Sequence, residues 1–184
     1  LYHRTMKNVA EVRKALGFRT IFNILGPLTN PAAVPVQVMG VYDPALLEVI
    51  ADVFIHLGIR GYVLCAEDRV DEATLTARTH MYRVADGRIH PEILDPLSLG
   101  MPRCQHSDLA GGTATENAAI IRAILDGRER GPHRDVVLLN AAVALSAAGT
   151  AQSLQEGVQH AAAAIDSGRA ARKLEEIIRC ASSG

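Results

Sequence analysis

Residues 19–32 read Arg-Thr-Ile-Phe-Asn-Ile-Leu-Gly-Pro-Leu-Thr-Asn-Pro-Ala, and the rest of the chain can be interpreted outward from them. Thr20 to Leu25 is rich in β-branched and aromatic residues, which is typical of a buried strand. Gly26-Pro27 and Asn30-Pro31 then predict turns, with Asn23 and Asn30 supplying amide groups on either side. Because glycine leaves space beside the main chain and proline restricts φ, the segment is either a stiff connector or a rigid loop that faces a ligand.

A helix is predicted ahead of this stretch, over residues 4–17, with Gly17 placed to end it. Its apolar face consists of Met6, Val9, Ala10, Val12 and Leu16. Arg13 falls inside that face, where a guanidinium either needs an anionic partner or must extend its long side chain to the surface. His3, at the start of the helix, is typical of a cap or a surface residue.

The composition favours an α/β fold. Of the 184 residues, 48% are apolar but only 4% are aromatic, and there is no Trp. A core of Ala, Val, Ile and Leu suits helices packed on a sheet, so we expect a mixed, mainly parallel sheet flanked by helices. The net charge of −1 argues against a protein dedicated to binding nucleic acid or a membrane surface. No apolar run reaches the roughly 18 residues that a membrane span requires.

A strand–helix–strand unit follows. We expect a strand from Gln37 to Tyr42, then a helix from Pro44 to Leu57 with Asp43 as its N-cap and Gly58 at its end. A second buried strand is expected from Gly61 to Ala66. Short links of this kind predict a parallel pair with a right-handed crossover, and ligands of such sheets bind at the carboxyl ends of the strands.

Four carboxylates come directly after the second strand of this unit, in the run Glu67-Asp68-Arg69-Val70-Asp71-Glu72. On a tight loop, Asp71 and Glu72 can reach one hard cation, and oxygen ligands without nearby His or Cys suit Mg²⁺ better than zinc. The alternative is an acidic loop that is simply solvated.

The remaining chain predicts a hairpin and then helices. His80 to Val84 and Arg88 to Ile93 should pair around a turn at Asp86-Gly87. Two S/T-x-x-E capping boxes and glycine stops define four helices, over residues 117–125, 132–148, 153–166 and 170–180. In the last of these helices, Leu174, Ile177 and Ile178 should form the buried face. Cys65, Cys104 and Cys180 are widely spaced and odd in number, which indicates reduced thiols in a cytoplasmic protein.

Taken together, these residues resemble anthranilate phosphoribosyltransferase. The resemblance is carried by His3-x-x-Met6-Lys7-Asn8-Val9-x-x-Val12-Arg13 and by the run from Arg19 to Ala32. It continues through Gly40-Val41-Tyr42, Asp71-Glu72, Asn117-Ala118-Ala119 and Leu139-Asn140-Ala141-Ala142. It covers the whole chain but only the C-terminal half of the family's, so residues 1–184 should be the C-terminal portion of the α/β domain.

The resemblance implies a reaction and a role for each candidate residue. The family joins anthranilate to phosphoribosyl pyrophosphate in tryptophan biosynthesis, with Mg²⁺, as a homodimer. Arg13 matches the arginine that faces the anthranilate carboxylate, and His3 matches a histidine of the same channel. Gly26 and Pro27 match the loop against anthranilate, and we add Asn23 as a candidate. Asp71 and Glu72 match the acidic pair that binds Mg²⁺ and, through it, the pyrophosphate. No catalytic acid or base is assigned.

Some motifs of the family do not occur in this sequence. Its Gly-Thr-Gly-Gly-Asp, Asn-x-Ser-Thr and Lys-His-Gly-Asn segments, which bind the donor phosphates and part of the acceptor, would precede Leu1, as would its N-terminal helical domain. Arg4-Thr5 and Arg69-Val70 also replace the usual Pro-Ala and Gly-Leu. We therefore expect this chain to be inactive alone. The alternatives are a pyrimidine-nucleoside phosphorylase-like enzyme and a nucleic-acid-binding relative without transferase activity.

Overall fold

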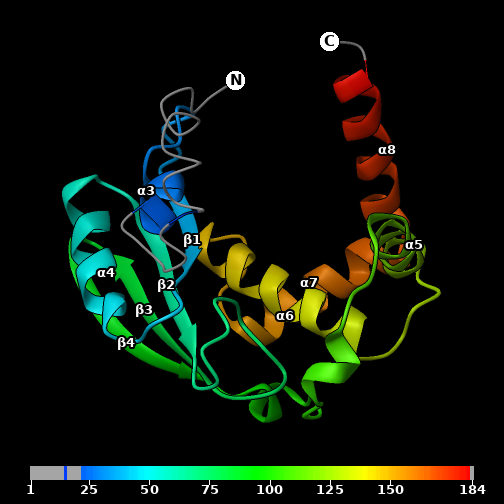
Figure 1. Cartoon of the computed structure of the whole chain (residues 1–184), viewed down its shortest axis with the longest axis horizontal. Coiled ribbons are helices and arrows are strands. Elements are labelled where there is room, and N and C mark those ends of the chain that lie inside the picture. The colour runs from blue at the N-terminus through cyan, green and yellow to red at the C-terminus, as the bar shows by residue number, and fades with distance from the viewer. Residues whose placement is uncertain (1–14, 16–21, 183–184) are drawn as a thin grey trace. The chain divides into compact units, whose positions relative to one another are not determined.

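The computed structural model describes Ala15 and residues 22–182, except for the side chains of Phe22 and Asn23. The chain divides into two compact units, residues 1–35 and 36–184, and each is described by itself. The first unit contains α3 (Phe22–Leu28), a short helix (Figure 1). The helix predicted over residues 4–17 lies outside the described residues, apart from Ala15, which is helical.

Helix α3 overturns the strand predicted from Thr20 to Leu25, because residues 22–25 are helical. The turn predicted at Gly26-Pro27 is wrong as well, since the helix continues to Leu28. Pro27 lies in the last turn of this helix and contributes no N–H there. Thr29 closes that end, where its N–H and its hydroxyl both donate to the Leu25 carbonyl, at 3.0 and 2.8 Å. The low helix propensity of β-branched and aromatic residues is a weak term that local context overrides.

The turn predicted at Asn30-Pro31 is confirmed. The Ala32 N–H donates to the Asn30 side-chain oxygen at 3.0 Å, and the Ala33 N–H donates to the Asn30 carbonyl at 3.0 Å. An asparagine side chain that bonds the main chain two residues ahead is a common way to start a turn. The first unit thus ends in a tightly bonded turn that follows the helix.

The second unit is built on a four-stranded sheet in the order β1-β2-β3-β4. Its strands are β1 (Val36–Gly40), β2 (Arg60–Ala66), β3 (Thr79–Ala85) and β4 (Arg88–Leu94). Strands β1 and β2 are parallel, with Gly40 opposite Leu64, and the other two pairs are antiparallel. The prediction of a mixed sheet is confirmed, but parallel pairs do not predominate in these four strands.

The strand–helix–strand unit is also confirmed, with α4 (Leu46–His56) between β1 and β2. The helix begins at Leu46 rather than Pro44, because residues 43–46 form a turn in which the Leu46 N–H donates to the Asp43 carbonyl at 2.9 Å and the Ala45 N–H donates to the Asp43 carboxylate at 3.0 Å. The hairpin turns at Asp86-Gly87 as predicted, with both residues at positive φ, 52° and 69°. Turns of this kind match the twist of paired strands.

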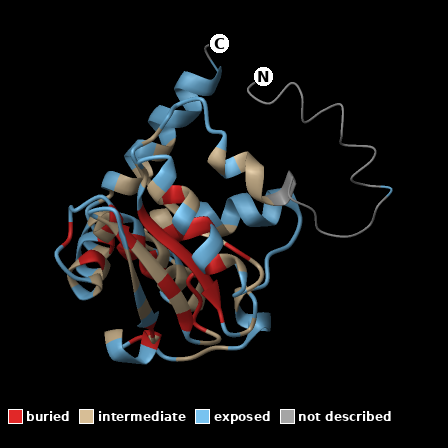
Figure 2. Cartoon of the chain, turned by 90° about the vertical axis from the view of Figure 1, so that its left-hand side faces the viewer, coloured by how far each residue is buried: buried red, intermediate tan, exposed pale blue. Residues whose placement is uncertain are grey.

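Strand β2 is buried on both faces, as its continuous apolar sequence suggests. Successive residues of a strand point to opposite faces, so Tyr62 and Leu64 face one side and Val63 and Cys65 the other. Tyr62 and Leu64 belong to the core shared with α6, and the Tyr62 hydroxyl is 3.2 Å from that of Ser146. Helix α4 packs on the sheet from the other side (Figure 1). Figure 2 shows the buried residues concentrated in the strands.

The C-terminal part of the second unit is helical. After two short 3₁₀ helices, η1 (Pro96–Leu99) and η2 (His106–Leu109), come α5 (Ala114–Leu125), α6 (Pro132–Ala147), α7 (Leu154–Asp166) and α8 (Arg169–Ser182). These confirm the four predicted helices, with small shifts at their ends. Helices α6 and α7 approach closely at Gly157, where an added Cβ would lie 2.8 Å from the Ala142 Cα. No helix among residues 22–182 is long and apolar enough to cross a membrane.

The buried face predicted for the last helix is wrong in this structure. Helix α8 has no buried residue, and Ile177 and Ile178 are 58% and 37% exposed. The apolar stripe that the sequence predicts is present, but only Leu174 is half-buried, beside α5, while Ile177 and Ile178 are left exposed. A periodic pattern shows which face of a helix is apolar, whereas burial depends on a partner that the pattern does not specify.

The start of α5 gives a test of the local structure. The Thr113 hydroxyl accepts from the Glu116 N–H at 3.4 Å, and the Thr113 N–H donates to the Glu116 carboxylate at 2.7 Å. The Thr113 N–H and hydroxyl both donate to the Glu116 carboxylate, which lowers the pKa of Glu116. Thr113 and Glu116 therefore form the capping box that the sequence predicts.

We predict that Thr113→Ala lowers the free energy of unfolding by about 1 kcal/mol, because it removes the side-chain cap. Thr113→Ser, which keeps the hydroxyl, should stay close to the wild type. Urea denaturation followed by circular dichroism measures both variants. Equal stability of the Ala variant and the wild type would contradict the role of the cap.

Candidate functional site

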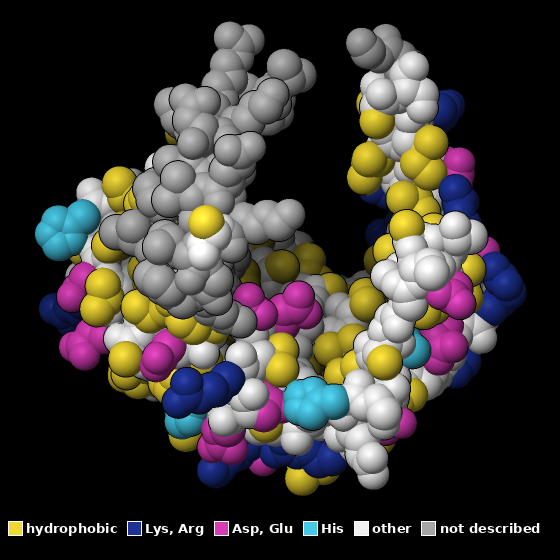
Figure 3. All heavy atoms as spheres, in the orientation of Figure 1, with side chains coloured by type: hydrophobic (Ala, Val, Ile, Leu, Met, Phe, Trp, Pro, Cys, Tyr) yellow, Lys and Arg dark blue, Asp and Glu magenta, His cyan; other side chains and the backbone are white. Residues whose placement is uncertain are grey.

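A cavity of about 510 Å³ opens where β1 and β2 end, between the loop after β2 and helix α6. Its lining consists of Val38, Gly40, Leu64, Asp71, Glu72, Val136, Val137, Asn140 and Ala141. Figure 3 shows acidic side chains, in magenta, beside a hollow with apolar walls. The carboxyl ends of neighbouring parallel strands are where α/β sheets bind their ligands, so this cavity is the candidate site.

The first two carboxylates of the acidic loop are held by neighbouring side chains. Glu67 forms an ion pair with Arg78 at 2.7 Å. Asp68 accepts a hydrogen bond from the Thr76 hydroxyl and lies 3.2 Å from the His106 ring. These contacts close the base of the loop, and neither residue lines the cavity.

Asp71 and Glu72, in contrast, are exposed and line the cavity together. In the described part of the chain, no side chain forms a hydrogen bond or ion pair with either carboxylate. Nor does any group of three or more His, Cys, Asp or Glu among the described residues have the arrangement of a metal site. A pair of carboxylates fits Mg²⁺, which is commonly bound through one or two carboxylates, waters and the phosphates of a substrate.

The main chain of β1 fixes the start of this acidic pair. A Cβ added to Gly40 would lie 1.5 Å from the Asp71 carbonyl oxygen, so the two backbones touch in a way that only glycine permits. The parallel pairing with β2 brings Gly40 to the level of Leu64, next to the loop that follows β2. Gly40 therefore determines how close Asp71 lies to the end of β1.

A second contact holds the end of the pair. The Asn140 side chain, on α6, exchanges two hydrogen bonds with the main chain of Ala73, at 3.1 and 2.7 Å. Ala73 is fully buried, whereas Glu72 before it is exposed. The loop thus enters the core directly after its two cavity-facing carboxylates.

Cys65 lies beneath this loop, near the end of β2, but its chemistry is suppressed. Burial, and then the negative charge of Asp43, raise the pKa of its thiol. The thiol is fully buried and donates a weak bond to the Ala66 carbonyl at 3.5 Å. All three cysteines are free, and Cys65 is a residue of the buried core.

The candidate acceptor residues belong to the first unit. Gly26 and Pro27 lie in α3, as does Asn23, whose side chain is not described. His3 and Arg13 lie outside the described residues. The structure therefore brings Asp71 and Glu72 together in one cavity and leaves the arrangement of the acceptor residues as a prediction.

Sequence reasoning missed the part that Gly40 and Asn140 play in this site. Asn140 interrupts the apolar run Val-Val-Leu-Leu-Asn-Ala-Ala-Val over residues 136–143. A side-chain amide in such an apolar run needs hydrogen-bond partners, so the sequence indicated that Asn140 bonds to another part of the chain. Gly40 lies inside the strand predicted from Gln37 to Tyr42, where a glycine often marks close approach of another backbone.

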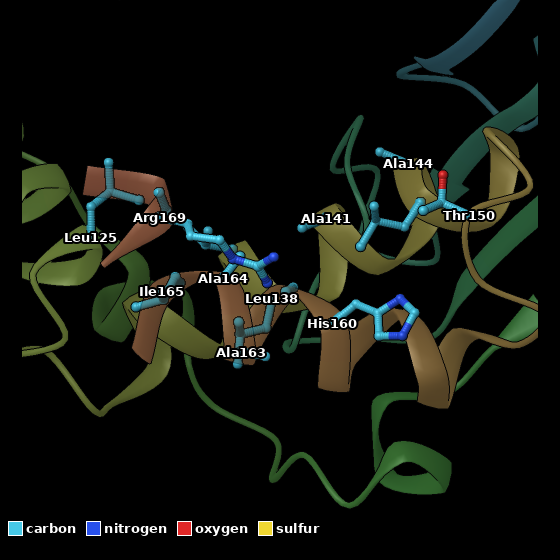
Figure 4. Close-up of a pocket in the computed structure, with 14 residues that line it drawn as sticks. Leu125, Leu138, Ala141, Ala144, Thr150, His160, Ala163, Ala164, Ile165 and Arg169 are labelled. Carbon is cyan, nitrogen blue, oxygen red and sulfur yellow. The ribbon is translucent and has the colours of Figure 1, made fainter. Parts of the chain in front are cut away.

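A second cavity, of about 700 Å³, lies on α6, α7 and α8. Its walls are almost entirely apolar, with Leu138, Ala141 and Ile165 among them, and Figure 4 shows His160 and Arg169 with them. His160 lies 3.6 Å from Glu156 of its own helix. The lining offers no carboxylate and no cluster of polar groups, so it does not suit a cation or a phosphorylated ligand.

Comparison with known proteins defines the class of the chain. Residues 1–171 match the model of the glycosyl transferase family, a/b domain. The chain therefore belongs to this family, and the a/b domain of its name agrees with a mixed sheet flanked by helices.

Two of its curated relatives are named anthranilate phosphoribosyltransferase. The protein from Moorella thermoacetica is 50% identical over 179 residues, covering 97% of this chain and 52% of the relative. That from Clostridium kluyveri is 51% identical over 178 residues, covering 96% and 53%. The chain spans about half the length of the curated relatives that it matches.

Solved structures show the same similarity. Anthranilate phosphoribosyltransferase from Thermus thermophilus is 41% identical, with a TM-score of 0.87 over 95% of this chain and 51% of its own. The enzyme from Saccharomyces cerevisiae in complex with PRPP and Mg is 29% identical, with a TM-score of 0.91 over 99% of this chain and 53% of its own. The α/β fold predicted from the sequence is confirmed.

We predict that Gly40→Ala displaces the loop at Asp71 and lowers the free energy of unfolding by about 1–3 kcal/mol, because the added methyl group overlaps the Asp71 carbonyl. Amide NMR spectra should show the largest shifts at residues 70–74, far along the chain from the substitution. Unchanged spectra and stability would mean that the two backbones are not in contact.

Proposed function

We propose that this chain is the C-terminal part of an enzyme that transfers a phosphoribosyl group from phosphoribosyl pyrophosphate to the amine of anthranilate. The products are phosphoribosylanthranilate and pyrophosphate, in tryptophan biosynthesis. The observation that carries the proposal is the position of Asp71 and Glu72 in a cavity at the strand ends. Neither carboxylate forms a hydrogen bond or ion pair with another described residue. The relatives of this name, at about half identity over nearly all of the chain, support it.

Asp71 and Glu72 are the proposed ligands of Mg²⁺. Two carboxylates leave most of the coordination sphere to water and to the oxygens of the pyrophosphate group, which suits this cation. When bound, Mg²⁺ neutralises charge on the leaving pyrophosphate. The walls at Val38, Leu64 and Val136 are apolar and offer the cation no competing ligand.

Anthranilate is the proposed ligand of Arg13, with His3, Asn23, Gly26 and Pro27 around it. A guanidinium can donate two parallel hydrogen bonds to a carboxylate, which fixes both the position and the plane of the aromatic acid. This contact would also give Arg13 the anionic partner that its apolar helix face calls for.

The reaction then depends mainly on positioning. The amine nitrogen forms a bond to the anomeric carbon as the bond to the pyrophosphate oxygen breaks, through an oxocarbenium-like transition state. Holding the two reactants in line supplies much of the rate enhancement in such a transfer. An arylamine is nucleophilic when neutral, and its proton is lost after the new bond forms, so no residue is assigned as a strong base.

The rest of the donor site is proposed to lie in the half of the relatives that this chain does not match. On this proposal the 184 residues are inactive alone, and the whole enzyme is a homodimer. A cytoplasmic location and the absence of nucleic-acid binding also stay predictions.

We predict that the chain gains phosphoribosyltransferase activity when it is fused to the N-terminal half of the Thermus thermophilus relative. The fusion should consume anthranilate with PRPP and Mg²⁺, which is measured as loss of anthranilate fluorescence, while the 184 residues alone should not. Thymidine and phosphate should give no thymine, which separates this function from that of a nucleoside phosphorylase.

Two sets of variants of the fusion serve as controls. Asp71→Asn with Glu72→Gln should raise the Mg²⁺ concentration needed for half-maximal rate, whereas Arg13→Ala should raise KM for anthranilate and leave that for PRPP nearly unchanged. Turnover by the isolated chain would overturn the proposal that it is inactive alone, and phosphorolysis of thymidine by an otherwise inactive fusion would overturn the proposed function.

A further inference from the structure

The acidic loop between β2 and β3 is bonded at its base but not at its tip. The Glu67 N–H donates to the Arg78 carbonyl and the Ala66 N–H to the Val70 carbonyl, both at 2.9 Å. These bonds order the ends of the loop. They do not reach the three residues from Asp71 to Ala73, which need other contacts to hold a single conformation.

Asn140 provides those contacts at Ala73. The Ala73 N–H donates to the Asn140 Oδ1 at 3.1 Å, and the Asn140 Nδ2 donates to the Ala73 carbonyl at 2.7 Å. The second hydrogen on Nδ2 goes to the Val136 carbonyl, one turn back on α6, at 3.0 Å. With the amide rotated by half a turn, its NH₂ would face the Ala73 N–H and its oxygen two carbonyls, so only one orientation fits.

These bonds locate consecutive peptide planes. The Ala73 N–H belongs to the peptide between Glu72 and Ala73, and the Ala73 carbonyl belongs to the next one. The preceding peptide, whose carbonyl is that of Asp71, rests on Gly40. The main chain on both sides of Glu72 is therefore held, by Gly40 before it and by Asn140 after it, and the Cα atoms of Asp71 and Glu72 are set by these contacts.

We propose that Asn140 is a positioning residue for the cation site, which holds the main chain at Ala73 so that the Asp71 and Glu72 carboxylates converge on one Mg²⁺. This rests on the proposed function, because it assumes that the pair binds the cation. Asn140 also lines the cavity, but its amide is already bonded to the protein on both atoms, so it acts through the loop and not on the metal.

Two adjacent carboxylates repel each other, and a mobile loop would separate them. Binding a cation would then have to bring them together and order the loop, at the expense of affinity. Partners that orient metal ligands in this way typically change metal affinity by about 10- to 100-fold when they are removed.

The chain contains a matched control. Asn117, on α5, forms the same pair of bonds with the main chain of Gly112, at 2.8 and 3.1 Å, in a loop that does not line the cavity. Asn140→Ala and Asn117→Ala therefore delete the same two-way contact, and only the first deletion concerns the acidic pair.

The test measures Mn²⁺ binding to the 184-residue chain with inorganic pyrophosphate present, from the electron paramagnetic resonance signal of free Mn²⁺. Asn140→Ala should weaken binding about 10- to 100-fold with unchanged stoichiometry, and Asn117→Ala should bind like the wild type. Hydrogen exchange at the Ala73 amide should become faster in Asn140→Ala only. Circular dichroism confirms that each variant is folded at the temperature used.

If Asn140→Ala does not fold, Asn140→Ser replaces it in the test. The serine hydroxyl keeps a polar group on α6, but the side chain is too short to form both hydrogen bonds with Ala73. Binding of Mn²⁺ by these variants as tight as that of the wild type would overturn the role of Asn140 and leave the cation site in place. Equal binding by the wild type and by Asp71→Asn with Glu72→Gln would overturn the cation site itself, and the role of Asn140 with it.

Discussion

The contact between the main chains of Gly40 and Asp71 is the constraint on which the site depends. It exists because β1 and β2 run parallel in a register that sets Gly40 beside Leu64. Parallel pairing brings the ends of both strands to one edge of the sheet, and the loop after β2 passes against the end of β1 at Gly40. Any side chain at position 40 would occupy the place of the Asp71 carbonyl. The register of β1 with β2 therefore determines both the strand pairing and the position of the acidic pair.

The electrostatics of the cavity follow from what surrounds this pair. Glu67 and Asp68 lie only a few residues away, but Arg78, Thr76 and His106 engage them. Asp71 and Glu72 have no such partner among the described side chains, and the walls beside them are mainly valine, leucine and alanine. Negative charge beside apolar surface attracts a cation more strongly than the same charge in open water. Within one loop, Glu67 and Asp68 thus bond to other parts of the protein, whereas Asp71 and Glu72 remain for a ligand.

Much of the second unit could be predicted from the sequence, because its signals are local. Gly58, the Asp86-Gly87 turn and the Thr113 capping box each act within a few residues, and the structure has them where the sequence predicts them. The wrong predictions concern features that depend on contacts with other parts of the chain. Residues 22–25 have strand-like composition but form α3, and most of the apolar stripe of α8 is exposed. The contact from Asn140 to Ala73 spans 67 residues, so no local pattern could have shown its partner.

The central claim is that a cation binds at the carboxyl ends of β1 and β2, between Asp71, Glu72 and α6. The most direct measurement is the paramagnetic broadening of amide resonances in the isotopically labelled chain when Mn²⁺ and pyrophosphate are added, because broadening falls steeply with distance from the ion. Broadening centred on Gly40, Asp71, Glu72 and Asn140 is the predicted result. Broadening centred on Glu67 and Asp68, or spread evenly over the acidic surface, would contradict it.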